Sequence, residues 1–186
     1  MDNEKIYKEL SGEESASARV GVPNLQVHRR RLEAAARLAG AMPRHRVLDI
    51  GCGNGELRKY LPSGCYYVGY DPVDHLVQEA SLNENPTNTE LHVGDAYTAL
   101  ERGERADIVF MLGVVATLEQ DEVRDVLRAV NGLVDRPGAI VVSIQGSGYK
   151  GAFRKSSVAE ISAALQCNVS RFTLTDTEIT GIWGIV

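Results

Sequence analysis

The stretch Val47-Leu48-Asp49-Ile50-Gly51-Cys52-Gly53-Asn54-Gly55 decides how the rest of this 186-residue chain is interpreted. Four strand-forming positions run directly into three alternating glycines, and a helix is expected from Glu56. Glycine tolerates positive φ and has no Cβ, so the backbone can turn sharply and approach a ligand closely. Such turns also occur in plain strand-to-helix connections, so the interpretation as a nucleotide cradle needs further support.

Two acidic residues provide that support. Asp49 lies at the end of a strand that looks buried, where packing alone would favour Val or Ile, so a polar partner must satisfy it. Asp71 ends a second strand, twenty residues after Gly51. A doubly wound sheet places at that position the carboxylate that accepts from the two ribose hydroxyls of a nucleotide. The two acids therefore predict a ribonucleoside ligand.

The glycine spacing distinguishes between two kinds of nucleotide. The NAD fingerprint has glycine at its first, third and sixth positions, whereas the sixth position from Gly51 is Glu56. An acid that opens the helix would repel a pyrophosphate. The pattern Asp-x-Gly-x-Gly-x-Gly, from Asp49 to Gly55, resembles the first motif of class I S-adenosylmethionine-dependent methyltransferases. S-adenosylmethionine carries a sulfonium and an amine and no phosphate, so Glu56 is compatible with it.

The later segments follow the order of that family's fold. Helical stripes are expected from Asn24 to Gly40, around 74–81, after Asp95, over 123–133 up to Pro137-Gly138, and after the capping box Ser157/Glu160. Further strands are expected at 91–94, 106–111, 139–144, 172–175 and 182–186, the last two around Gly181. The resemblance implies an α/β fold with a doubly wound, mostly parallel seven-stranded sheet, helices on both faces and an antiparallel C-terminal strand.

Composition limits the organisation and the partners of the chain. The length suits one domain, expected at 23–186, preceded by an N-terminal arm or lid at 1–22. A net charge of −5 argues against binding of long nucleic acids, and three scattered cysteines suggest neither zinc nor disulfides. Without a signal peptide or a long apolar run, a cytoplasmic protein that has no membrane segment is expected.

The resemblance implies roles for residues at the ends of four strands. The carboxylate of Asp95 would accept from the adenine amino group, and the backbone of Leu112 and Gly113 would accept from the cofactor amine. Asp95 also has a simpler use as the cap of the helix that starts at Ala96, and the two uses are compatible. The candidate cofactor-binding residues are Asp49, Gly51, Gly53, Gly55, Asp71, Pro72, Asp95, Ala96, Leu112 and Gly113.

The expected reaction is direct displacement at the methyl group of S-adenosylmethionine, which leaves S-adenosyl-L-homocysteine as product. The protein then mainly aligns the acceptor and excludes water, and no catalytic base is required. If a base is used, Glu119 and Tyr149 are the candidates, because they lie in loops that face the cofactor. The candidate substrate-binding residues are Tyr7, His28, Tyr149 and Lys150.

Absent motifs narrow the substrate. The turn at 111–114 lacks the Asn/Asp-Pro-Pro-aromatic pattern of amino-methylating enzymes, no cysteine stands beside a proline, and no carboxylate cluster suggests a metal. A small molecule with a nucleophilic O, N, S or C atom fits best. The alternatives are an RNA or protein methyltransferase that binds through Arg29-Arg30-Arg31, and a non-catalytic S-adenosylmethionine-binding partner subunit. The sequence leaves open whether the protein is a monomer or a homodimer.

Overall fold

The structure is a computed structural model that describes residues 25–82, 88–145, 156–174 and 178–185. Within these residues, seven strands form one sheet in the order β3-β2-β1-β4-β5-β7-β6. The strands are β1 (Arg46–Ile50), β2 (Tyr66–Asp71), β3 (Thr89–Val93), β4 (Ala106–Met111), β5 (Val134–Gln145), β6 (Val169–Leu174) and β7 (Glu178–Ile185). Strands β1 to β5 pair in parallel, whereas β7 is antiparallel to both β5 and β6. The predicted sheet is confirmed.

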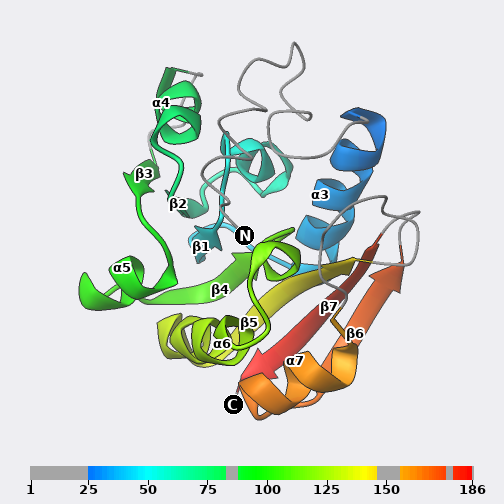
Figure 1. Cartoon of the computed structure of the whole chain (residues 1–186). Helices are drawn as coiled ribbons and strands as arrows, with labels where there is room; N and C mark the ends of the chain where they lie inside the picture. Colours follow the sequence, from blue (N-terminus) through cyan, green and yellow to red (C-terminus); the bar gives the residue numbers. More distant parts are fainter. Residues whose placement is uncertain (1–24, 83–87, 146–155, 175–177, 186) are drawn as a thin grey trace.

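Helices cover both faces of the sheet (Figure 1). They are α3 (Leu25–Ala39), α4 (Asp74–Leu82), α5 (Ala96–Glu101), α6 (Glu122–Leu133) and α7 (Val158–Leu165), with 3₁₀ turns η1 (Glu56–Tyr60) and η2 (Val115–Thr117). Helices α5, α6 and α7 pack on one face around Leu127 and Trp183. Helix α3 and turn η1 pack on the other face around Phe110. The two buried layers hold β1 and β4, the central pair of the sheet, between them.

Local sequence patterns explain several of these elements. The stripe Leu32, Ala35, Ala36 and Ala39 is buried, so α3 packs on the sheet through small residues and one leucine. Ser157 and Glu160 form the predicted capping box at the start of α7. Among the described residues, no helix is long and apolar enough to cross a membrane.

Two predicted boundaries are wrong. Pro137-Gly138 does not end a helix, because α6 stops at Leu133 and β5 begins at Val134. Pro137 falls in the register shift between β4 and β5, where a missing N–H is tolerated. Gly181 lies inside β7 rather than in a turn. A Cβ there would lie 2.6 Å from the Trp183 ring, so the glycine makes room for that side chain.

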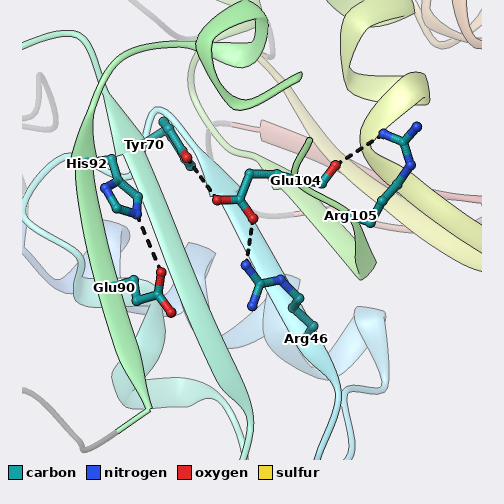
Figure 2. A network of polar contacts seen from close by, with 6 residues as sticks. All are labelled: Arg46, Tyr70, Glu90, His92, Glu104 and Arg105. Atoms are coloured by element: carbon teal, nitrogen blue, oxygen red, sulfur yellow. Dashed lines mark hydrogen bonds and ion pairs between the residues drawn. The ribbon is translucent and has the colours of Figure 1, made fainter. Parts of the chain in front are cut away.

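A polar network ties together the β1–β2–β3 side of the sheet (Figure 2). The carboxylate of Glu104 accepts from Arg46 Nη2 at 2.6 Å and from Tyr70 Oη at 2.9 Å. The rings of Tyr70 and His92 lie 4.9 Å apart, and His92 Nε2 is 3.6 Å from Glu90 Oε2. The network links the start of β1 and the loop before β4 to Tyr70, which precedes the last residue of β2.

Candidate cofactor site

A cavity of about 420 Å³ lies at the carboxyl ends of β1, β2 and β4. Its wall includes the glycine turn after β1, Asp71 at the end of β2, and Leu112 and Gly113 after β4. The sheet order reverses between β1 and β4, and ligands of open α/β sheets bind outside the strand ends at such a point. The volume lies in the range of small-molecule sites.

The glycine turn has the backbone geometry that its sequence predicts. Gly51, Gly53 and Gly55 have φ of 75°, 54° and 71°, values that favour glycine. A Cβ on Gly51 would collide with the side chain of Val114, so the turn and the loop after β4 are in close contact. The backbone N–H groups of Gly51 and Cys52 both donate to the Tyr70 carbonyl, at 2.8 and 3.0 Å. The turn is therefore fixed to β2 and open toward the cavity.

Asp71 is part of the framework that holds this turn. Its Oδ2 accepts from the backbone N–H of Gly53 at 2.8 Å, and its Oδ1 accepts from that of Val73 at 2.9 Å. Burial raises the pKa of Asp71, and the two backbone hydrogen bonds partly oppose that effect. A carboxylate oxygen can accept more than one hydrogen bond, so both oxygens retain capacity for a ligand.

Asp49 has the polar partner that its buried position requires. Tyr67 Oη donates to Asp49 Oδ2 at 2.6 Å, and both side chains are buried. Burial raises the pKa of Asp49 to about 7, although the Tyr67 hydrogen bond lowers it and Arg31 lowers it by a smaller amount. The cavity wall therefore contains a carboxyl group whose charge changes near neutral pH.

Two further predicted positions also lie in the cavity wall. Asp95 caps α5, because its Oδ1 accepts from the backbone N–H and the hydroxyl of Thr98, each at 2.9 Å. The predicted cap is confirmed, and Asp95 and Ala96 both line the cavity. The N–H of Gly113 donates to Ser143 Oγ at 2.7 Å, which fixes the loop after β4. Ser143 is itself buried in β5.

Helix α3 contributes charged residues to the cavity wall, and of these the sequence predicted His28 but not Arg31. Arg31 and His28 are buried and line the cavity, whereas Arg29 and Arg30 are exposed. His28 Nδ1 is 3.2 Å from Arg31 Nη2, and His28 Nε2 is 3.1 Å from Glu56 Oε2. The hydrogen bond with His28 lowers the pKa of Glu56 to about 2 against the effect of burial, with help from Lys59. A Cβ on Gly113 would lie 3.3 Å from Arg31 Nη1, so the guanidinium lies beside that glycine.

Arg31 does not belong to one exposed basic run with Arg29 and Arg30, because its side chain is buried. Residue 31 shares its helical phase with His28, Leu32 and Ala35, all of which are buried. That spacing was a usable signal, but the charge of three consecutive arginines concealed it. Glu56 was noted only for its position in the glycine motif, and its contact with His28 depends on the packing of α3 against η1.

The structure brings together nine of the ten predicted cofactor residues and His28 in the cavity wall. The tenth, Gly55, is buried and precedes η1 but is not among the lining residues. Glu119 is exposed and does not line the cavity. Tyr7, Tyr149 and Lys150 lie outside the described residues, as does the arm at 1–22. All three cysteines are free, and within the described ranges no group of three or more His, Cys, Asp or Glu side chains could hold a metal.

A family model described as a methyltransferase domain matches residues 47–138, about half of the chain, from β1 to the start of β5. A search of curated proteins finds no match. The matched segment contains the glycine turn, Asp71, Asp95 and the loop after β4. It therefore covers most of the cavity wall except α3.

Solved methyltransferase structures share the fold over nearly the whole chain. N-methyltransferase NodS from Bradyrhizobium japonicum, in complex with S-adenosyl-L-homocysteine, is 14% identical over 98% of each chain, with a TM-score of 0.80. Magnesium protoporphyrin IX methyltransferase from Synechocystis, with bound S-adenosylmethionine, is 18% identical over 100% of this chain and 98% of its own, with a TM-score of 0.77. A complex of the Haloferax volcanii Trm112 methyltransferase activator with a methyltransferase contains a similar chain, 13% identical over 86% of this chain and 92% of that chain, with a TM-score of 0.66. With the glycine motif, the matched domain and this shared fold, the chain belongs to the class I S-adenosylmethionine-dependent methyltransferases.

Proposed function

We propose that the cavity binds S-adenosylmethionine and that the protein transfers its methyl group to a small molecule. The observation that carries this proposal is the charge of the cavity wall. Five carboxyl groups line it, and Arg31 is the one Lys or Arg side chain among the described lining residues. The carboxyl groups are those of Asp49, Glu56, Asp71, Asp95 and Glu122.

This distribution of charge favours S-adenosylmethionine and disfavours a dinucleotide such as NAD. A dinucleotide would bring a pyrophosphate to the start of η1, where Glu56 is held in its charged form by its low pKa. S-adenosylmethionine has two cationic groups and one carboxylate, which fit an acidic wall that holds a single guanidinium. When bound, it supplies a methyl group made electrophilic by the adjacent sulfonium. Asp71 would hold the ribose, and Asp95 and Ala96 would hold the adenine.

Neither His28 nor Glu119 gives the cavity a proton acceptor, so we infer that the cavity mainly aligns the methyl acceptor. Both ring nitrogens of His28 already contact protein groups, and the exposed Glu119 does not line the wall. The rest of the wall beside η2 is largely apolar, with Val114, Leu118 and Val126. These residues would exclude water from a small acceptor that carries its own nucleophile. The name of magnesium protoporphyrin IX methyltransferase, which is similar in fold, supports an acceptor of this class.

Isothermal titration calorimetry tests the cofactor. S-adenosylmethionine and S-adenosyl-L-homocysteine should bind at micromolar concentration and NAD should not. A metabolite extract incubated with methyl-labelled cofactor, followed by mass spectrometry, then identifies the acceptor. Binding of NAD alone, or of none of the three, would contradict the proposal.

One observation favours a second candidate, a methyltransferase that depends on a partner subunit. The chain is similar in fold to a chain from an activator–methyltransferase complex. A protein of this kind would bind S-adenosylmethionine but give no labelled product until a companion chain is added. An RNA methyltransferase is less well supported, because only Arg29 and Arg30 of the arginine run are exposed. Binding of RNA that weakens steeply as the salt concentration rises would support an RNA methyltransferase instead.

A further inference from the structure

Arg31 is positioned by a chain of contacts that begins at the glycine turn. Arginine is always a donor, so the 3.2 Å contact with Arg31 Nη2 requires His28 Nδ1 to be the acceptor. A neutral imidazole then carries its proton on Nε2, which lies 3.1 Å from Glu56 Oε2. Glu56 in turn accepts from Lys59 Nζ at 3.1 Å. The residues Glu56, His28 and Arg31 form what we call the α3 relay.

The α3 relay is buried where it meets the cavity. His28 and Arg31 are 3% and 7% exposed, and the Glu56 side chain is 13% exposed. Burial of a guanidinium is costly unless partners fix it, so its place in a ligand cavity calls for an explanation. The guanidinium lies beside Gly113, and its charge acts on Asp49. It is the one cationic Lys or Arg side chain among the described residues of an otherwise acidic wall, and a ligand carboxylate would therefore be attracted to it.

We propose that Glu56 and His28 hold the Arg31 guanidinium beside Gly113, where it binds the carboxylate of the cofactor's amino-acid end. This inference rests on the proposed function. The planar fork of arginine suits bidentate carboxylate binding, and a fixed fork loses less entropy when it binds. Glu56, the residue that departs from the dinucleotide fingerprint, thereby becomes a positioning residue for the other end of the ligand. A carboxylate on the methyl acceptor would offer the same chemistry.

Two ligands separate these possibilities by calorimetry. S-adenosyl-L-homocysteine has the amino-acid end, and 5′-methylthioadenosine has the same nucleoside and thioether without it. Arg31→Gln should weaken the binding of S-adenosyl-L-homocysteine about 10- to 100-fold, the effect of losing a charged hydrogen bond. The affinity for 5′-methylthioadenosine should stay within about twofold of the wild-type value. Arg31→Lys should show an intermediate, equally selective loss, because it keeps the charge without the fork. Arg29→Gln, on the exposed side of α3, is the matched control and should change neither ligand.

The positioning residues have their own selective readout. His28→Phe and Glu56→Leu should each weaken S-adenosyl-L-homocysteine about 5- to 10-fold with little effect on 5′-methylthioadenosine. Glu56→Gln keeps an acceptor for His28 Nε2–H and should restore most of the affinity. A purely structural role would affect both ligands equally and would not be rescued in this way.

The outcomes are distinguishable. If neither ligand binds the wild-type protein, the proposed function fails before the relay is tested. If Arg31→Gln binds S-adenosyl-L-homocysteine normally, the carboxylate assignment to the cofactor is overturned, even if the variant raises the KM of an anionic acceptor. If Arg31→Gln is selective but His28→Phe and Glu56→Leu bind normally, the positioning role is overturned. Equal loss of both ligands in Arg31→Gln and Arg31→Lys also contradicts the proposal.

Discussion

Strand β2 carries two buried tyrosines, and each donates its hydroxyl to a carboxylate on a different face of the sheet. Tyr67 donates to Asp49 at 2.6 Å in the cavity wall, within the layer of α3. Tyr70 donates to Glu104 at 2.9 Å in the layer of α5, where Arg46 also donates to that carboxylate (Figure 2). The two pairs use the same donor type from the same strand, so their differences come from the surroundings of each carboxylate.

The surroundings give the two carboxylates opposite properties. Burial would raise the pKa of Glu104, but the hydrogen bonds from Arg46 and Tyr70 outweigh it and hold that pKa below its ordinary value. Burial dominates at Asp49 and raises its pKa to about 7, because Arg31 acts there only weakly. A carboxylate whose charge is satisfied by the protein serves the fold. One whose charge is incompletely satisfied at neutral pH is suited to a cationic ligand.

The largest effect on cofactor binding should come from a substitution in the glycine turn of the cavity wall. Gly53→Val places a β-branched side chain at a φ of 54° and beside the Asp71 carboxylate that fixes the turn. We expect calorimetry to detect no S-adenosyl-L-homocysteine binding, a loss of about 100-fold or more. The circular dichroism spectrum should remain that of the folded protein. Normal binding would show that the glycine turn is not the cofactor cradle.

Asp71→Ala should have the next largest effect. It removes the proposed ribose acceptors and leaves the Gly53 and Val73 N–H groups without their partner. We expect a loss of about 2 kcal/mol in cofactor binding, roughly 30-fold. Asp74→Ala, three residues along and exposed, is the control that should bind like wild type. Unchanged affinity in Asp71→Ala would contradict the placement of the ribose.

The Glu104 side should respond in the opposite way. Glu104→Gln keeps the shape of the side chain but removes the charge that Arg46 and Tyr70 use. Urea denaturation should show a loss of about 1 to 1.5 kcal/mol in the free energy of unfolding, with cofactor affinity unchanged. A loss of affinity in this variant would mean that the two tyrosine–carboxylate pairs are not functionally separate.

The sequence predicted the parts of the site that depend on local patterns. The glycine turn, Asp71 at the end of β2 and the cap by Asp95 all follow from neighbouring residues, whereas the sheet was expected from the resemblance to the methyltransferase family. The partner of Asp49 was inferred as a requirement but was not identified, because Tyr67 reaches it from the adjacent strand. Pairing across strands is set by tertiary register, which no short window of sequence contains.

The place of Arg31 in the cavity wall was missed for a related reason. Charged residues on a helix are normally solvated, and only the packing of α3 against η1 turns His28 and Arg31 inward. The boundary errors at Pro137 and Gly181 have the same origin. Both residues were interpreted as local punctuation, whereas a register shift and the Trp183 ring accommodate them inside strands.

The last prediction concerns the dependence of both stability and binding on pH, and its sign follows from Asp49. Its pKa of about 7 in the folded protein lies above the ordinary value of 3.8, so the folded state holds the proton more tightly than the unfolded state. The free energy of unfolding without ligand should therefore fall as pH rises from about 4 to about 7. The pKa of Asp71 is raised as well, so Asp71 also contributes to the fall in stability as pH rises. The share of the pH dependence that is lost in Asp49→Asn is the share due to Asp49.

Binding should change with pH in the opposite sense. A cationic cofactor favours the ionised form of Asp49, so affinity should rise through pH 7 while stability without ligand declines. S-adenosylmethionine should bind about tenfold more weakly at pH 6 than at pH 8, because ionisation of Asp49 costs about 1.4 kcal/mol per pH unit below its pKa. Calorimetry at both pH values measures this, and Asp49→Asn should bind with a nearly flat profile. If the affinity of the wild-type protein does not change with pH, Asp49 stabilises the fold, as Glu104 does, and has no role in cofactor binding.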